Sequence, residues 1–345
     1  MNKVQAILYA LLAAVFYAIN VPISKLLMEK VTATMMASLL YLGAGIGISV
    51  LSFINRKDRK KSEKLSGKDL PFVIAMILLD IAAPIFLMFG VRNGSSANAS
   101  LLGNFEIVTT TLITLFIFKE KVSKRLWLAI ALITLSSILL SFEGGESLTP
   151  SYGSLCVLAA TICWGFENNC TRNISSKSTY EIVILKGIFS GLGALMIAFF
   201  KKESFPSFPY LMQALLLGFV AYGLSIFLYV RAQNILGAAK TSAYYAVAPF
   251  IGTFLSFVFL HEKLSLNFLI SLIVMIAGSV PVVVDTLIVH HEHLHTHTFT
   301  HTHDGTTHTH TVVHSHGHDH YLNDENHGHH HSIEELEKLA GASHI

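Results

Sequence analysis

The sequence predicts an all-α polytopic membrane protein: ten transmembrane helices in a five-plus-five inverted repeat, followed by a polar, His-rich cytoplasmic tail. Three observations carry this prediction. Hydrophobic residues make up 52% of the 345 residues and charged residues only 13%, about half of what a soluble surface needs. The first half of the chain resembles the second at a spacing of 142–147 residues. Eighteen of the 19 histidines lie between His290 and His344.

Ten apolar stretches are long enough to cross a bilayer, which needs roughly 20 residues per helix. They are 4–24, 32–54, 71–91, 97–117, 125–142, 152–171, 181–200, 209–230, 241–260 and 266–288. Lys25 ends the first stretch and no small-residue cleavage site follows it, so we expect a span rather than a signal peptide.

The same composition excludes other classes of protein. The apolar content excludes a disordered chain, and the three cysteines exclude a disulfide scaffold. A net charge of +2, with scattered basic residues, argues against binding to nucleic acid. The lipid bilayer is therefore the expected partner, and a homodimer is left as an open alternative.

The basic residues predict the orientation. With the N-terminus inside, the inner loops hold sixteen lysines and arginines and the outer loops six. Basic residues concentrate in cytoplasmic loops. We therefore expect a multi-pass protein of the cell (inner or plasma) membrane with both termini in the cytoplasm.

The internal repeat divides the chain into four parts. The segment from Ala99-Ser100 to Lys119-Glu120-Lys121 echoes the segment from Thr241-Ser242 to His261-Glu262-Lys263. Because each copy holds an odd number of helices, the copies must be inverted, which is typical of secondary transporters. The predicted parts are a first repeat at 1–146, a second repeat at 147–288, a His-rich tail at 289–331 and a short helix at 332–345.

Two motifs within the repeats resemble a known family. They are Ala160-x-x-x-Trp164-Gly165, with a weaker first copy that ends in Tyr17-Ala18, and Pro249 placed thirteen residues before Glu262. With them, residues 4–288 resemble the EamA-like transporters of the drug/metabolite transporter superfamily. Ile107 stands where the second copy has Pro249, so the first copy departs from the pattern. The resemblance implies ten helices and the export of amino acids or other metabolites.

Four ionisable residues fall inside the predicted spans: Asp80, Glu106, Glu167 and Lys186. An ionisable group at membrane depth costs at least ~2.5 kcal/mol, so each is a candidate for binding substrate or a proton. Glu106 alternatively pairs with Lys186 to hold helices together. Asp80 alternatively hydrogen-bonds backbone groups that Pro84 frees four residues later.

Polar and aromatic residues complete the predicted substrate site. Glu167 aligns with Asn20 of the first copy and is expected to face a central cavity, with a solvated loop position as the alternative. Trp164 matches the family's cavity aromatic, or else anchors its helix at the membrane interface. The remaining candidates are Asn104, beside Glu106, and Tyr244 and Tyr245, which line the cavity or pack against a neighbour.

Three cysteines share one helical stripe. Cys156, Cys163 and Cys170 recur every seven residues. Cys163, Glu167 and Cys170, spaced i, i+4, i+7, could offer soft ligands to zinc or copper, or the cysteines simply act as small packing residues.

Alternating histidines dominate the tail and predict metal binding. Neutral imidazoles are common ligands of zinc, nickel, cobalt and copper. The expected ligands are His291, His293, His295, His297, His301, His303, His308, His310, His314, His316, His318 and His320.

The alternation also predicts a β-hairpin. Asp304-Gly305 favours a two-residue type I′ turn. That turn sets His301 opposite His308, His295 opposite His314, His293 opposite His316, and His291 opposite His318. An isolated hairpin is marginal in water, so we expect a disordered tail that metal closes into the hairpin. Farther on, Ser332-Ile333-Glu334-Glu335 is a capping box that predicts the short C-terminal helix.

Three hypotheses of function follow. The first is secondary transport of a small organic metabolite, with a metal-responsive tail. The second is transport of a divalent metal ion that the tail delivers or senses, and the third is a membrane-anchored metal store. The chain has no Gly-x-x-x-x-Gly-Lys loop and no catalytic constellation, so we expect neither an ATP-driven pump nor an enzyme, and no required cofactor.

Overall fold

The computed structural model describes residues 3–55, 63–119, 122–142, 151–174, 177–236, 241, 244–303 and 306–321. The chain divides into two compact units, Met1–Asp285 and Thr286–Ile345. Several features of the sequence analysis lie outside the described residues: Glu120, Lys121, Ser242, the Asp304-Gly305 turn, the tail beyond residue 321 and the predicted helix at 332–345.

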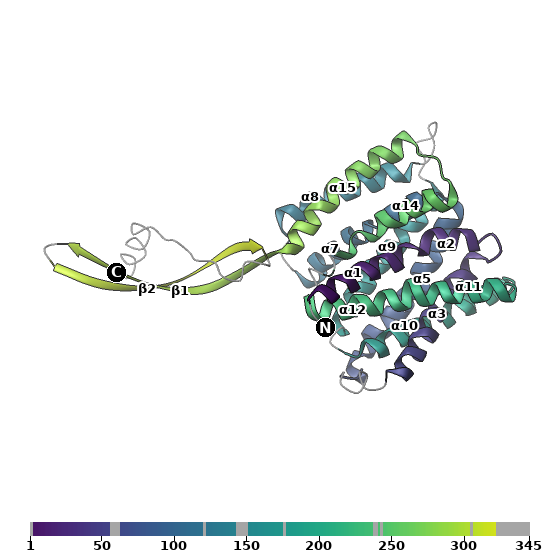
Figure 1. The fold of residues 1–345 in the computed structure, drawn as a ribbon, viewed down its shortest axis with the longest axis horizontal. Helices are drawn as coiled ribbons and strands as arrows, with labels where there is room; N and C mark the ends of the chain where they lie inside the picture. The colour runs from purple at the N-terminus through teal and green to yellow at the C-terminus, as the bar shows by residue number, and fades with distance from the viewer. Residues whose placement is uncertain are drawn as a thin grey trace. The chain divides into compact units, whose positions relative to one another are not determined.

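Every regular element in the described part of the first unit is a helix (Figure 1). Its first half contains α1 (Lys3–Ala18), α2 (Asn20–Leu27), α3 (Ala33–Ile54), the 3-10 helix η1 (Gly67–Asp69), α5 (Leu70–Asn93), α6 (Ser96–Leu102), α7 (Phe105–Phe118) and α8 (Lys124–Ser141). Its second half contains α9 (Tyr152–Ile174), α10 (Thr179–Phe200), α11 (Phe208–Gly218), the π-helix η2 (Phe219–Leu224), α12 (Ser225–Leu236), α14 (Ala248–Leu260) and α15 (Leu266–Leu287).

Eight helical segments of the described chain are long and apolar enough to cross a membrane. The protein is therefore a polytopic membrane protein. The other two predicted spans correspond to α9, which carries Glu167 and Arg172, and to α14, which has 13 residues. Large apolar side chains such as Phe199, Phe200 and Ile273 are mostly exposed, as expected for surfaces that face lipid. The count of ten crossings stays a prediction.

Several predicted continuous spans are broken in the structure. The first breaks at Ile19, between α1 and α2, because Pro22 lacks an N–H and its ring would clash with the carbonyl of Ala18. The fourth breaks at Gly103 and Asn104, between α6 and α7. The eighth changes to π-helical geometry over η2. Interruptions of this kind occur where the backbone lies against other protein segments rather than lipid.

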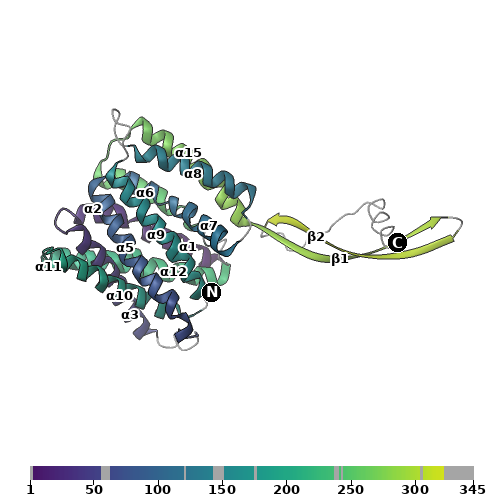
Figure 2. The ribbon, with the colours of Figure 1, turned by 180° about the vertical axis from the view of Figure 1, so that it is seen from behind.

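Helices of one half pack against helices of the other in a reciprocal pattern. The helix of the third predicted span, α5, packs along α9 of the sixth, and α1 of the first span packs along α12 of the eighth in the corresponding way. The helices of the second and seventh predicted spans, α3 and α10, also lie together. The helices of the fifth and tenth predicted spans, α8 and α15, run side by side in both views (Figures 1 and 2), joined by a hydrogen bond from Ser136 Oγ to the carbonyl of Ser271 (2.7 Å). An inverted repeat predicts this reciprocity.

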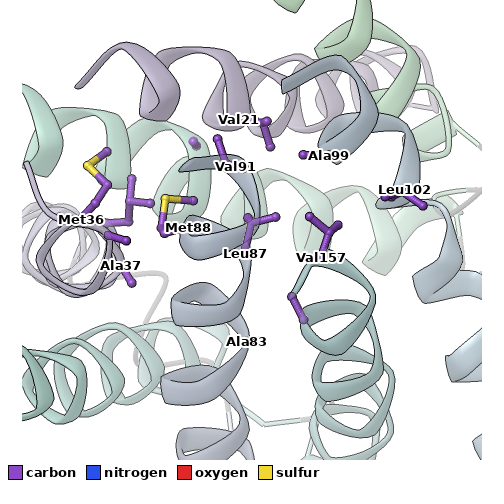
Figure 3. Close-up of a cluster of buried hydrophobic side chains, with 14 of the residues drawn as sticks. Val21, Met36, Ala37, Ala83, Leu87, Met88, Val91, Ala99, Leu102 and Val157 are labelled. Carbon is purple, nitrogen blue, oxygen red and sulfur yellow. The ribbon is translucent and has the colours of Figure 1, made fainter. Parts of the chain in front are cut away.

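Small residues allow the closest of these contacts. A Cβ atom on Gly187 of α10 would lie 2.3 Å from the backbone nitrogen of Gly45 on α3. Larger apolar residues fill the neighbouring space, and Figure 3 shows Leu87 and Met88 of α5 among Met36 of α3 and Val157 of α9. Close backbone approach through glycine is typical of membrane helix pairs, in which the lipid supplies no hydrophobic driving force.

The second unit contains a two-stranded antiparallel sheet of β1 (Ile288–His303) and β2 (Thr306–Tyr321). Its backbone register pairs His291 with His318, His293 with His316, His295 with His314, and His301 with His308. These are the partners that the sequence predicts, because the position of Asp304-Gly305 and the alternation of residues together set the register.

Candidate functional site

Three buried charged side chains meet between the halves of the helical unit. Lys186 Nζ of α10 lies 3.2 Å from Asp80 Oδ2 of α5 and 2.9 Å from Glu167 Oε1 of α9. Asp80 is 0% exposed, Glu167 2% and Lys186 9%. The lysine therefore bridges a carboxylate of the first half and a carboxylate of the second.

The charges of this trio do not balance when all three groups are ionised, because two carboxylates face one ammonium. Hydroxyl donors offset part of the excess: Tyr41 OH donates to Asp80 Oδ1 at 2.7 Å, and the Thr171 hydroxyl donates to Glu167 Oε1. An uncompensated charge is costly away from water. The arrangement can therefore take up a proton or a cationic group.

Uncharged side chains next to the trio are linked by ring packing and hydrogen bonds. The ring of Tyr41 packs against that of Tyr222, with centroids 5.1 Å apart. Tyr222 OH accepts a hydrogen bond from Asn20 Nδ2 (3.1 Å), and Asn20 Oδ1 accepts one from the hydroxyl of Ser24 (3.1 Å). Tyr222 lies in the π-helix η2, a geometry that is frequent at functional sites.

Glu106 lies beside the break between α6 and α7, in the first turn of α7. Its Oε1 accepts a hydrogen bond from Asn168 Nδ2 of α9 at 2.6 Å, and the residue is half-buried. An acidic residue in the first helical turn also complements the positive end of the helix dipole. Just before it, Asn104 is buried, and its Nδ2 has no hydrogen-bond partner among the described residues.

The second half has a break at the equivalent place. Tyr244 and Tyr245 are helical, Ala246 and Val247 form a turn, and α14 begins at Ala248. Paired discontinuities in corresponding spans of an inverted repeat are the best structural pointer to a substrate site. The two breaks and the charged trio therefore define the candidate site.

Some alternatives weighed from the sequence are wrong in this structure. Glu167 is not a solvated loop residue, because it is buried within α9. Lys186 pairs with Asp80 and Glu167 rather than with Glu106. The contacts of the Asp80 carboxylate are with Tyr41 and Lys186, not with backbone groups near Pro84.

The aromatic candidates occupy different positions. Trp164 is 7% exposed and belongs to the main hydrophobic core, so it is not an interfacial anchor. Tyr245 contacts the rings of Tyr17 and Tyr229 and lies 3.4 Å from the hydroxyl of Ser225. Tyr244 is half-buried.

Sequence reasoning missed Tyr41, Tyr222 and Asn168. A signal existed for the two tyrosines: Tyr41 lies 145 residues before Lys186, and Tyr222 lies 142 residues after Asp80. Both spacings fall within the period of the internal repeat. Applying the repeat to each intramembrane charge would have identified both tyrosines.

A metal centre formed by side chains of the helical unit is not supported. Cys156, Cys163 and Cys170 are free thiols. In the part of the chain whose side chains the structure describes, no group of three or more His, Cys, Asp or Glu could hold a metal ion. The tail histidines are outside that part, so their predicted role as ligands stays a prediction.

Two carboxylates of the second half, Glu262 and Glu203, accept hydrogen bonds at the starts of helices of the first half. Glu262, which follows α14, accepts hydrogen bonds from Ser95 Oγ (2.7 Å) and from the backbone N–H groups of Ser96 (2.7 Å) and Ala97 (2.9 Å), and so caps α6. Glu203, which follows α10, accepts from Thr32 Oγ1 (2.5 Å) and the backbone N–H of Met35 (3.1 Å) at the start of α3.

These contacts set the protonation of Glu203. Burial by itself would raise the pKa of this carboxyl, but hydrogen bonds from Thr32, Lys201, Thr34 and Met35 together lower the pKa below its ordinary value. Glu203 therefore stays ionised as a cap near neutral pH, where it accepts from the free N–H groups at the start of α3.

Comparison with known proteins agrees with this architecture. An uncharacterized transporter of Methanothermobacter thermautotrophicus is 24% identical over 299 residues, which cover 81% of this chain and 86% of that protein. The uncharacterized transporter YoaV of Bacillus subtilis is 25% identical over 255 residues, covering 69% of this chain and 82% of its own.

A solved structure and a family model extend the comparison. A crystal structure with 16% identity has a TM-score of 0.60 and covers 81% of this chain and 96% of its own, so it shares the fold. The model of the EamA-like transporter family matches twice, at residues 4–142 and 151–284, once in each half. The chain belongs to the EamA-like transporter family.

Proposed function

We propose that this protein is a secondary transporter that exports a small organic metabolite, such as an amino acid, across the cell membrane. Both termini lie in the cytoplasm in this proposal, in agreement with the bias of basic residues towards the inner loops. Ion gradients or facilitated diffusion supply the driving force. Membership of a transporter family supports the general function, and the buried charges support the mechanism.

The bridging contacts of Lys186 are the observation that carries this proposal. Asp80 belongs to the first half, whereas Glu167 and Lys186 belong to the second. In alternating access, one repeat rocks against the other around a central site. That movement must lengthen the contact between Lys186 and Asp80, which is costly while both groups are charged and buried. Protonation of a carboxylate, or arrival of a charged substrate group, removes part of this cost and so couples binding to movement.

Counterflow in proteoliposomes tests the proposal. Vesicles that contain the full chain would be loaded with one unlabelled amino acid at a time and assayed for uptake of its radiolabelled form. We expect at least one amino acid to exchange, and Glu167→Gln to lower its rate by roughly tenfold or more, since proton-transfer groups contribute about 10²–10⁴-fold in catalysis.

Glu29→Gln is the matched control, because Glu29 is an exposed carboxylate just after α2. It should leave the exchange rate unchanged. Exchange that is equally fast in wild type, Glu167→Gln and Glu29→Gln would refute the role of the trio. Absence of exchange for all amino acids would refute this substrate class.

A second candidate function is transport of a divalent transition-metal ion such as zinc, nickel or cobalt. The density of histidines after residue 289 favours it, since such a tail could deliver or sense cargo. The test measures cellular metal in strains that express nothing, the full chain, or a chain ending at Val289, at equal membrane levels. A metal whose content still changes with the shortened chain is cargo. A change that needs the tail identifies a buffer or sensor and favours an organic substrate.

A further inference from the structure

We propose that the tail contains a divalent transition-metal site built from histidines that face one another across β1 and β2. The register places three histidine pairs on consecutive alternate rungs of the ladder: His291 with His318, His293 with His316, and His295 with His314. We call these six residues the three-rung block. Alternate positions of a strand share a face, so all six belong to the same face of the hairpin.

The spacing of the rungs suits a metal ion with four ligands. Opposite residues of an antiparallel pair have Cβ atoms about 4.5–5.5 Å apart, and rungs two residues apart lie roughly 6.4–6.8 Å from each other. Zinc takes four ligands in tetrahedral geometry, with Zn–N distances of about 2.0–2.1 Å. Two adjacent rungs, such as His293 with His316 and His295 with His314, therefore supply a full set of nitrogen ligands.

The ligand type defines the class of ion. Neutral imidazole suits zinc, nickel, cobalt and copper, whereas magnesium and calcium prefer oxygen ligands. Closer to the turn, rungs of the other face are threonine pairs, Thr298 with Thr311 and Thr300 with Thr309. Thr309 and Thr311 are exposed. Threonine favours strands, so these rungs support the register in which the histidines oppose one another.

The tail also contains an internal control. His297 lies opposite Val312, and His310 lies opposite Phe299. These histidines have the same chemistry and a similar position along the hairpin as those of the three-rung block, but no histidine faces them across the ladder. A site built by strand pairing depends on the paired histidines, whereas an unstructured His-rich tract depends only on their number.

Zinc titration of the full-length protein in detergent, against a competing chelating dye, distinguishes a site built by strand pairing from an unstructured His-rich tract. We expect the double variant His293→Ala/His316→Ala to weaken the tightest zinc site at least tenfold, because even loss of an outer-shell partner costs roughly 10–100-fold in metal affinity. The matched variant His297→Ala/His310→Ala should leave that site unchanged. Equal losses in both variants, or no zinc binding in the wild type, would overturn the proposal.

Disulfide crosslinking tests the register independently of the histidines. In a background with the three native cysteines replaced by serine, cysteines would be introduced at Thr298 and Thr311, which are opposite in the register. The control pair, Thr298 and Thr307, is displaced by four residues, about 13 Å, which exceeds the ~4.4–6.8 Å between the Cα atoms of a disulfide. Zinc should speed crosslinking by oxidised glutathione in the first pair only. Equal crosslinking of the two pairs with zinc present would refute the hairpin site.

Discussion

At the scale of single residues, Lys186 determines whether the buried carboxylates are tolerated. Asp80 and Glu167 both contact its ammonium, and neither is more than 2% exposed. Tyr41 and Thr171 donate hydrogen bonds to them, but neither hydroxyl carries a compensating charge. The trio therefore functions as one electrostatic unit in which each partner's stability depends on the other two.

Replacement of the lysine tests this dependence. Lys186→Met should destabilise the protein by about 3–5 kcal/mol, the usual result of removing one partner from a buried ion pair. Thermal unfolding in detergent measures the effect. The triple variant Asp80→Asn/Glu167→Gln/Lys186→Met should recover most of the lost stability, because it leaves no uncompensated charge. A triple variant as unstable as Lys186→Met would show that the lysine acts by packing.

At the scale of elements, close approach between α3 and α10 depends on Gly45 and Gly187. A methyl group on Gly187 would lie 2.3 Å from the backbone nitrogen of Gly45, which is too close for any side-chain adjustment to relieve. α3 and α10 therefore meet backbone to backbone at these glycines. This contact also supports the site, because α10 positions Lys186 and α3 positions Tyr41.

Gly187→Ala should separate these helices and destabilise the protein by about 1–3 kcal/mol, the usual cost of overpacking. The midpoint of thermal unfolding reports this loss. Gly67→Ala provides the control, since nothing lies within 4 Å of the added methyl group in η1. Comparable losses in the two variants would mean that the α3–α10 contact is not the cause.

Because Glu203 caps α3 with a charged carboxylate, its contribution to the stability of the folded protein should depend on pH. The folded pKa of Glu203 is lowered, so its contribution to stability is complete above the ordinary value of about 4.5 and is lost as pH falls through the folded value. Glu203→Gln should therefore lower the unfolding temperature at pH 7, and the difference from wild type should shrink below about pH 4.5. A difference that is the same at both pH values would exclude the charge of Glu203 as its cause.

At the scale of the whole molecule, the helical unit and the tail are separate compact units that divide after Asp285. Each half of the helical unit by itself matches the family model, whereas no part of the match extends beyond residue 284. The carboxylates Glu262 and Glu203 join the halves at one set of helix ends, and the charged trio joins them in the interior. Stability of the helical unit should therefore depend on contacts within residues 3–285.

Removal of the tail tests this division. A chain that ends at Val289 keeps α15 complete and should unfold at the same temperature as the full chain in the absence of metal. Added zinc should bind only the full chain, a difference that equilibrium dialysis can measure. Marked destabilisation of the shortened chain without metal would show that the two units depend on each other.

The sequence by itself determined the class of fold, the membrane body, the repeat and the register of the tail, since each depends on local composition or regular spacing. The charges Asp80, Glu167 and Lys186 were also predictable, because ionisable residues are costly in apolar spans. Only the tertiary structure decided their partners. Whether Lys186 meets Glu106 or Asp80 depends on how α5, α9 and α10 pack, and Tyr41 and Tyr222 belong to the site because α3 and η2 bring them there. The repeat period points to the positions of Tyr41 and Tyr222. Which side chains meet is decided by packing between residues far apart in the chain, and no local pattern specifies that packing.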